Sequence, residues 1–363
     1  MVTLVSAPGR VCTFGEHQDY LGLSVIPAAI NKRCFIQGDF TSDGKIILDD
    51  KIYNEIIKIP LSPDEMLNGY LLNKNDYLKA VLNVVIKRGL LKKKNSQLGF
   101  RGILRNEVPQ RSGLSSSAAL LVTFTKLIDE MFQLDLNEVE IGIIAYKAEH
   151  DELGIPCGQM DQLAASIGNM FHMKCVEPPE IEKIGYKLPG LVVGDTLIPK
   201  STNNVHSIRV KEITDAISFL TNQMKFDINT TKFEDVDEIL KISNETWLKR
   251  MRATLKNRDI TRTAYNELKK PSPDLSFLGS LLTKHQNYLR EDYEVSIKKI
   301  DDMISAGMQA GAQGGKLTGA GMGGSIIMLA PEKQKEVAKA LTQAGGKGYV
   351  VEIDRGASVT SLS

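Results

Sequence analysis

Short apolar runs separated by turn residues fill the first 60 positions of the chain. The runs are rich in β-branched residues and read "LVSAPGRVCTFG", "SVIPAAI", "KRCFIQGDF" and "KIILDD". Runs of this length that are bounded by turn residues predict β-strands. The run "GFRGIL" at residues 99–104 predicts one more strand, so the chain begins with a β-rich segment.

Helical periodicity follows these strands. Residues 73–89 predict a helix whose apolar face consists of Leu78, Val81, Leu82 and Val85. The serine-rich loop at 112–117 leads into a second helix, with an apolar stripe of Leu120, Phe124, Leu127, Ile128 and Met131. A third helix is expected to begin at Asn137, a good N-cap with Glu140 three residues later, and to continue to about Leu153.

The second half of the chain has a mostly helical pattern up to about residue 306, with a break at "KKPSPD". The last of these helices is predicted from a stripe of Tyr293, Ile297, Ile300 and Ile304, and Gly307 is expected to end it. A glycine-rich segment, the strand "SIIML", a helix at 332–344 and the strand "YVVEI" follow.

Strands and helices are segregated along the chain and do not alternate strictly, which predicts an α+β fold. A length of 363 residues is too great for one simple core and favours two domains. Residues 176–190 hold three prolines and few apolar residues, a composition typical of a domain boundary. We therefore predict an N-terminal domain at 1–185 and a C-terminal domain at 186–363.

Charge and composition exclude several classes of function. Lys and Arg number 45 against 44 Asp and Glu, so the basic excess of a nucleic-acid-binding protein is absent. The four cysteines are widely spaced without a CxxC pair, which argues against a zinc site. No apolar run has the length of a membrane span, and the N-terminus does not resemble a signal peptide. We expect a cytoplasmic protein with no membrane and no nucleic-acid partner.

The stretch "GEHQDYLG" at residues 15–22 is a polar turn between apolar flanks. Glu16, His17 and Asp19 place two carboxylates and a ring nitrogen close together, a set that suits the vicinal hydroxyl groups of a polyol. The alternative is that Glu16 and His17 only brace the turn.

The loop "SGLSSSAAL" combines a glycine, three serines and the start of a helix. Gly113 lets the backbone approach a ligand closely, while Ser115, Ser116 and Ser117 supply hydroxyl groups at the positive end of the helix. This combination predicts a phosphate cradle, although a serine-rich N-cap on its own is more often only a cap.

The segment "GGKLTGAGMGG" at residues 314–324 matches two common patterns incompletely. It contains GxGxxG, but a strand-like sequence follows it where a dinucleotide-binding site requires a helix. Gly315 and Lys316 resemble part of a P-loop, but Leu317 stands where Ser or Thr is required. The segment therefore predicts a glycine loop, with Gly321 and Gly323, that can bring its backbone close to a ligand.

Taken together, "APGRVCTFGEHQDYLG", "VPQRSGLSSSAAL" and "GGKLTGAGMGGS" resemble the three signature motifs of the GHMP kinases, in the family's order. "AEHDELGIPCGQMDQ" at 148–162 and "NDYLKAV" resemble galactokinases in particular. The resemblance implies an N-terminal domain similar to the second domain of ribosomal protein S5 and a ferredoxin-like C-terminal domain. It also implies transfer of the γ-phosphoryl group of ATP to an alcohol, with Mg²⁺ as cofactor.

The same resemblance implies roles for individual residues. Asp161 matches the catalytic aspartate, which accepts or orients the proton of the attacking hydroxyl, and Arg10 matches the cation that neutralises charge beside it. Ser117 and Glu149 match the metal-binding Ser and Glu. The implied sugar-binding residues are Glu16, His17 and Asp19, and those implied for ATP are Gly113, Ser115, Ser116, Ser117, Gly321 and Gly323.

The predicted function is an ATP-dependent kinase that phosphorylates the anomeric hydroxyl of a sugar, similar to galactokinases. One alternative keeps the chemistry but changes the substrate to another aldose such as arabinose or fucose, a uronic acid or mevalonate. An acidic substrate would need a further Arg or Lys besides Arg10, which already serves the phosphate. The second alternative is a non-catalytic sensor of sugar and ATP, although such proteins tend to have damaged motifs and here the motifs are intact.

Overall fold

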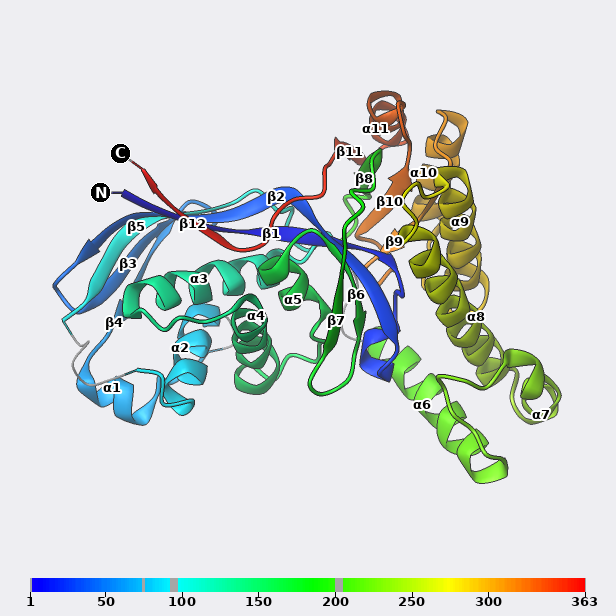
Figure 1. Ribbon diagram of the computed structural model, residues 1–363, viewed down its shortest axis with the longest axis horizontal. Coiled ribbons are helices and arrows are strands. Elements are labelled where there is room, and N and C mark those ends of the chain that lie inside the picture. Colours follow the sequence, from blue (N-terminus) through cyan, green and yellow to red (C-terminus); the bar gives the residue numbers. More distant parts are fainter. Residues whose placement is uncertain (1, 74–75, 92–96, 200–204, 363) are drawn as a thin grey trace.

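The computed structural model describes residues 2–73, 76–91, 97–199 and 205–362, which form two β-sheets with helices packed against them (Figure 1). The first sheet has eight strands, ordered β12-β1-β2-β5-β3-β4, with β6 paired to β2 and β7 paired to β6. Its strands are β1 (Val2–Phe14), β2 (Ser24–Thr41), β3 (Lys45–Asp50), β4 (Glu55–Pro60), β5 (Gly99–Asn106), β6 (Met170–Lys174), β7 (Glu180–Ile184) and β12 (Ser358–Leu362).

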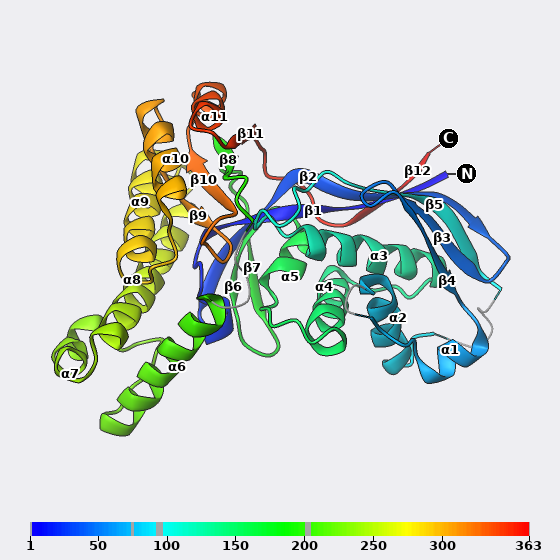
Figure 2. The ribbon, with the colours of Figure 1, turned by 180° about the vertical axis from the view of Figure 1, so that it is seen from behind.

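Helices cover one face of this sheet, as the two opposite views show (Figures 1 and 2). They are α1 (Pro63–Asn68), α2 (Tyr77–Lys87), α3 (Ser116–Phe132), α4 (Glu138–Lys147) and α5 (Met160–Ile167), with a π-helical turn at Ala148–Glu152. The apolar stripe of α3 packs on the strands, where Phe124 and Leu127 join Ile36 and Phe100 in one buried cluster. Burial of this stripe is the main source of stability for such a helix.

The second sheet is smaller and entirely antiparallel, with the order β11-β8-β10-β9. Its strands are β8 (Leu191–Asp195), β9 (Gly314–Thr318), β10 (Ser325–Leu329) and β11 (Lys347–Val350). The helices of this half are α6 (Val205–Gln223), α7 (Asp237–Ser243), α8 (Glu245–Leu268), α9 (Leu275–Glu291), α10 (Lys298–Gln309) and α11 (Gln334–Gln343). The strand order is that of a ferredoxin-like unit, and the α+β prediction is confirmed.

Two details of the predicted elements were wrong. The two strands expected at 24–30 and 32–40 are one continuous strand, β2. Helix α10 begins at Lys298, so Tyr293 and Ile297 precede it, and Gly307 lies inside it. A Cβ at Gly307 would lie 2.7 Å from Met328 Cε, so glycine at this position allows the helix to pack closely on β10.

Several strands lie in segments where the sequence pattern predicted none, namely β6, β7, β8, β9 and β12; β8 lies in the half expected to be mostly helical, and β9 in the segment expected to be a glycine loop. Strand β7 lies within the proline-rich segment at 176–190 and pairs with β6, and the last strand, β12, pairs with β1. The ends of the chain therefore lie side by side in the first sheet (Figure 1). The division at 185/186 stays a prediction, with the correction that residues 358–362 belong to the first sheet.

None of the helices in the described ranges is both long enough and apolar enough to span a bilayer.

Candidate functional site

The polar stretch at residues 15–22 is the connection between β1 and β2. Gly15 and Gly22 take positive φ angles of 91° and 72°, and His17 takes 60°, so the chain turns tightly here. The turn is not a solvated loop: the exposed fractions of Glu16, His17 and Gln18 are 4%, 7% and 1%. Buried polar groups need partners, and these partners come from both halves of the molecule.

Arg10 and Asp161 form a two-pronged ion pair at the centre of the site. Arg10 lies on β1 and is buried, and its Nε and Nη2 each donate to one carboxylate oxygen of Asp161 at 2.7 Å. Asp161 lies in the first turn of α5, whose N-cap is Gln159. Asp161 is therefore not the N-cap of this helix, and its carboxylate contacts Arg10.

The serine loop joins this pair. Arg10 Nη1 donates to the Gly113 carbonyl at 2.6 Å, and the Ser115 hydroxyl donates to Asp161 Oδ2. Ser115 sits at the N-cap of α3 with a left-handed backbone, φ 63°. Three segments that are distant in the sequence are therefore connected around one carboxylate.

Burial and the neighbouring charges shift the pKa values of two groups in this site. Burial alone would lower the pKa of Arg10, but the interactions with Asp161, followed by those with Glu16 and Cys12, together raise it above its ordinary value. Burial, followed by the neighbouring carboxylates of Asp161 and Glu16, raises the pKa of Asp19 to about 6. Arg10 therefore keeps its charge, whereas Asp19 titrates close to neutral pH.

Gly158 lies directly against Asp19. A Cβ at Gly158 would lie 1.9 Å from Asp19 Oδ2, which is far inside contact distance. The position therefore needs glycine if Asp19 is to keep its place beside Asp161. Gly158 lies within "GIPCGQMDQ", and nothing in the local sequence relates it to Asp19, 139 positions earlier.

Lys316 is a second buried cation that the sequence predictions missed. Its ammonium group donates to Glu16 Oε2 at 2.9 Å and to the Cys12 carbonyl at 2.9 Å, and its side chain is fully buried. Lys316 had entered the predictions only through an incomplete P-loop pattern. The signal that could have identified it is a lone charge within a buried strand whose other residues are uncharged.

The serine loop and the glycine loop lie against each other. A Cβ at Gly113 would lie 2.9 Å from the Thr318 carbonyl, and one at Gly324 would lie 3.0 Å from the Ser112 carbonyl. Glycine is required at these positions because the two backbones meet with no room for a side chain. The fold thus places side by side the two loops expected to hold a triphosphate.

The glycine loop is also tied to its own domain. The N–H groups of Met322 and Gly324 donate to the carbonyls of Val295 and Ile198, both at 2.8 Å. A Cβ at Gly321 would lie 2.4 Å from the Val295 carbonyl, and one at Gly323 would lie 2.6 Å from that of Ile198. Fewer backbone N–H groups therefore remain to bind phosphate than the number of glycines suggests. Gly321 and Gly323 are also needed for packing, because a side chain at either position would clash with a carbonyl.

The two expected metal-binding residues, Ser117 and Glu149, come from different helical elements. Ser117 is in the first turn of α3, and Glu149 is buried in the π-helical turn, where it accepts from Gln162 Nε2 at 2.7 Å. Within the described ranges, no three His, Cys, Asp or Glu side chains gather as a metal site. One carboxylate and one hydroxyl fit Mg²⁺, since this ion typically takes its remaining ligands from phosphates and water. Ser116 differs, because its hydroxyl accepts from Asn106 at 3.0 Å.

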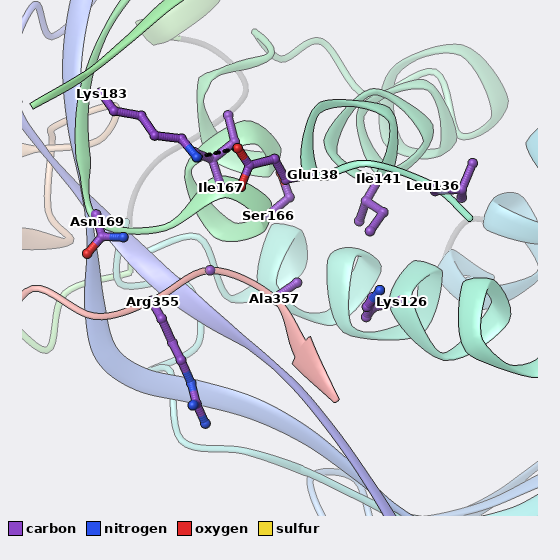
Figure 3. Close-up of a pocket in the computed structure, with 11 residues that line it drawn as sticks. Lys126, Leu136, Glu138, Ile141, Ser166, Ile167, Asn169, Lys183, Arg355 and Ala357 are labelled. Carbon is purple, nitrogen blue, oxygen red and sulfur yellow. Dashed lines mark ion pairs between the residues drawn. The ribbon is translucent and has the colours of Figure 1, made fainter. Parts of the chain in front are cut away.

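A separate pocket of about 270 Å³ lies at the other end of α5 (Figure 3). Ser166 and Ile167 line it, whereas Asp161 lies in the first turn of the same helix. Lys183 and Glu138 form an ion pair at its edge. None of the predicted site residues lines this pocket, so it is not part of the site described above.

Comparison with known proteins places these features in a family. Three family models match: a galactokinase galactose-binding signature at residues 3–39, the GHMP kinases N terminal domain at 76–169 and the GHMP kinases C terminal domain at 265–347. The galactokinase of Limosilactobacillus reuteri is 30% identical over 351 residues, covering 91% of this chain and 86% of that protein. The chain belongs to the GHMP kinase family.

Other relatives of this GHMP kinase agree with that assignment. A galactokinase of Haemophilus influenzae is 28% identical over 92% of this chain and 87% of its own length. The crystal structure of Lactococcus lactis galactokinase complexed with galactose has a TM-score of 0.84 at 26% identity, and covers 98% of this chain and 95% of that one. The Methanococcus jannaschii mevalonate kinase has a TM-score of 0.74 at 20% identity, with 97% and 98% covered, which shows a common fold. The two-domain GHMP kinase fold is therefore confirmed.

Proposed function

We propose that this protein transfers the γ-phosphoryl group of ATP to the anomeric hydroxyl of galactose. The chain is a GHMP-family sugar kinase similar to galactokinases along almost its whole length. The observation that carries the specific proposal is the group formed by Arg10, Asp161 and Ser115 beside the polar loop that holds Asp19. The galactose-binding signature matches the segment that contains that loop and Arg10.

Asp161 is the residue proposed to meet the attacking hydroxyl. Arg10 fixes both of its oxygens, and 30% of the Asp161 side chain is exposed, so the carboxylate is both oriented and accessible. Phosphoryl transfer passes through a loose transition state, in which positioning and charge neutralisation provide most of the catalysis. Asp161 is proposed to hold the hydroxyl in line and accept its proton, while Arg10 offsets the developing charge.

The adjacent loops at 112–117 and 319–324 are proposed to hold the phosphates of ATP. The first turn of α3 directs backbone N–H groups and the positive end of a 17-residue helix at this position. Ser117 and Glu149 are the residues proposed to hold Mg²⁺ there. When bound, the ion would neutralise charge on the phosphate oxygens.

The charge of the site favours a neutral sugar over an acidic substrate. A substrate with a carboxylate would need a further cation besides Arg10. The sequence predictions named none, but the structure places Lys316 beside the loop. Lys316 is fully buried and paired with Glu16, and Arg10 is paired with Asp161. In the described part of the chain, neither cation beside this loop is left for the carboxylate of a uronic acid or of mevalonate.

The sensor alternative has less support. A protein that only binds sugar and ATP has no need for an accessible carboxylate held by two arginine nitrogens at 2.7 Å. That geometry is typical of a preorganised catalytic group.

A substrate panel tests the proposed function. ADP release is measured with ATP, Mg²⁺ and each of galactose, arabinose, fucose, glucose, galacturonate, glucuronate and mevalonate, and phosphorus NMR locates the new ester. We expect the highest kcat/KM with galactose and a phosphate on the anomeric carbon. A preference for an acid, an ester at another carbon, or no sugar-dependent ADP release contradicts the proposal.

A further inference from the structure

Three side chains of the loop at 15–22 form hydrogen bonds or an ion pair with residues of the second half of the chain. Glu16, Gln18 and Tyr20 alternate along the loop, and each contacts a different element of that half. Lys316 on β9 binds Glu16, and Gln18 Nε2 donates to the Thr254 carbonyl on α8 at 2.9 Å. The hydroxyl groups of Tyr20 and of Tyr293, which follows α9, lie 2.6 Å apart. The proposed sugar-binding loop is therefore shaped by residues more than 200 positions away.

Lys316 is the most deeply buried of the three partners from the second half of the chain. Its register partner is Ile327 in the centre of the second sheet, and no part of its side chain reaches solvent. Its ammonium group reaches across to the first sheet, where the Cys12 carbonyl and Glu16 Oε2 accept from it. A fully buried ammonium group is costly unless a charge compensates it, so Lys316 and Glu16 depend on each other.

Among the residues that the structure describes, Glu16 is the one carboxylate that forms an ion pair with Lys316. His285 on α9 is buried, and burial, followed by the positive charge of Lys316, lowers the pKa of its imidazole well below the usual value. Arg10 is already engaged with Asp161. Glu16 is thus the counterion of Lys316, and Lys316 also determines where Glu16 lies.

We propose that Lys316 is a positioning residue for the sugar pocket, which acts through Glu16. The proposal rests on the proposed function. Lys316 compensates one carboxylate of the pocket and fixes its orientation from the second domain. Substrate recognition in the first sheet therefore depends on the correct docking of the second sheet.

The consequence for kinetics is specific. Loss of the ammonium group leaves the Glu16 carboxylate buried without its counterion, so the hydroxyl-accepting geometry of the loop is lost. The ATP loops are built from other residues. We therefore expect Lys316→Met to raise the KM for galactose at least about tenfold, and to change the KM for ATP by less than about threefold.

A double-mutant cycle tests whether Lys316 acts through Glu16. Steady-state kinetics with galactose, ATP and Mg²⁺ are measured for the wild type and for Lys316→Met, Glu16→Gln and the double variant. If the proposal holds, Lys316→Met has its full effect on the galactose KM in the wild-type background and less than about a twofold effect in the Glu16→Gln background. Additive effects would mean that Lys316 has only a general structural role, and would overturn the proposal.

Two further variants guard against failure to fold. Lys316→Arg keeps the charge and is expected to recover part of the galactose KM. Lys298→Met is the matched control, since Lys298 is 86% exposed and pairs with Asp302 on the surface, and it should change nothing. Thermal unfolding is recorded for each variant. If Lys316→Met is unfolded while the double variant folds, the dependence between the two residues is supported; if neither folds, Lys316 serves packing and the proposal is wrong.

Failure of the proposal is distinguishable from failure of the proposed function. A wild type that releases no ADP with galactose contradicts the function, and with it the sugar-pocket role of Lys316. An active wild type combined with an unchanged galactose KM in Lys316→Met contradicts only the inference.

Discussion

The Arg10–Asp161 pair and the Lys316–Glu16 pair are two ion pairs beside the same loop, but they differ in geometry and exposure. The first lies within the first domain and is two-pronged, and 30% of the Asp161 side chain is exposed. The second crosses between the two sheets through a single contact, and only 4% of the Glu16 side chain is exposed. Asp161 is thus oriented and still accessible to a substrate, whereas Glu16 is largely committed to its counterion.

The role of a carboxylate beside an active site therefore does not depend on its charge alone. Its partner fixes the geometry, and its exposure determines whether a ligand can reach it. Asp161 combines a rigid partner with access, as a group in direct contact with the reacting hydroxyl requires. Glu16 combines a buried partner with little access, as a group that shapes the pocket requires. Three experiments test this distinction.

The largest effect is expected at Asp161. Asp161→Asn keeps the shape of the side chain but removes the charge that Arg10 holds, and kcat should fall by about two to four orders of magnitude, the scale of a lost positioned base. ATP binding, measured by calorimetry, should remain. Glu16→Gln sharpens the comparison, since we expect it to raise the KM for the sugar by about tenfold while kcat stays within about tenfold.

The surface change Asp302→Asn, which removes the partner of Lys298, is the matched control for Asp161→Asn. A kcat for Asp161→Asn within threefold of the wild type would contradict the role of Asp161. Equal losses of kcat in Asp161→Asn and Glu16→Gln would remove the distinction between the two pairs.

The next effect is expected at Gly158, which supports Asp19 between the two pairs. Gly158→Ala places a methyl group where Asp19 Oδ2 lies, so the carboxylate must move. We expect the KM for galactose to rise by about tenfold, the usual cost of one misplaced hydrogen bond, with the KM for ATP unchanged. Gly154→Ala is a useful control because no atom lies within 4 Å of a Cβ there, although its φ of 65° adds some strain. The same KM change in both variants would point to a general effect of alanine in this segment.

The last prediction is a pH dependence from Asp19, whose effect is small near neutral pH and grows only in acid. Its pKa is raised by burial, and then by Asp161 and Glu16, to about 6, so the carboxylate gains a proton as the pH falls through this value. A protonated Asp19 accepts hydrogen bonds from the sugar less well. We expect kcat/KM for galactose to fall roughly tenfold at one pH unit below 6, and to be constant above pH 7 as far as this group is concerned.

Protonation of Asp19 lowers activity but increases the stability of the folded protein. Because the folded pKa exceeds the ordinary value of 3.8, Asp19 binds more protons in the folded state between about pH 4 and 6. Asp19 therefore adds stability as the pH falls through this window, and acid unfolding caused by Asp19 does not explain the loss of activity. Asp19→Asn should abolish this part of the pH profile; if the profile is unchanged in that variant, another group is responsible.

The sequence by itself determined the local parts of the molecule. Runs of β-branched residues identified strands such as β1, β3, β5 and β10, and helical periodicity identified α2, α3 and α11, because burial of one face leaves its pattern in the sequence. The three glycine- and serine-rich motifs indicated the family, and in that context Asp161, Arg10 and Asp19 were proposed as site residues; the fold brings Arg10 and Asp161 into contact. Strand β12 was missed because its pairing partner, β1, lies at the other end of the chain.

Only the tertiary structure decided which charges meet. Lys316 and Glu16 are 300 positions apart, and nothing in the sequence near Lys316 indicates which carboxylate is its counterion. Gly158 became meaningful only when Asp19 was found against it. The physical reason is that propensity and periodicity act over a few residues, whereas the requirement that each buried charge be paired applies to neighbours in space.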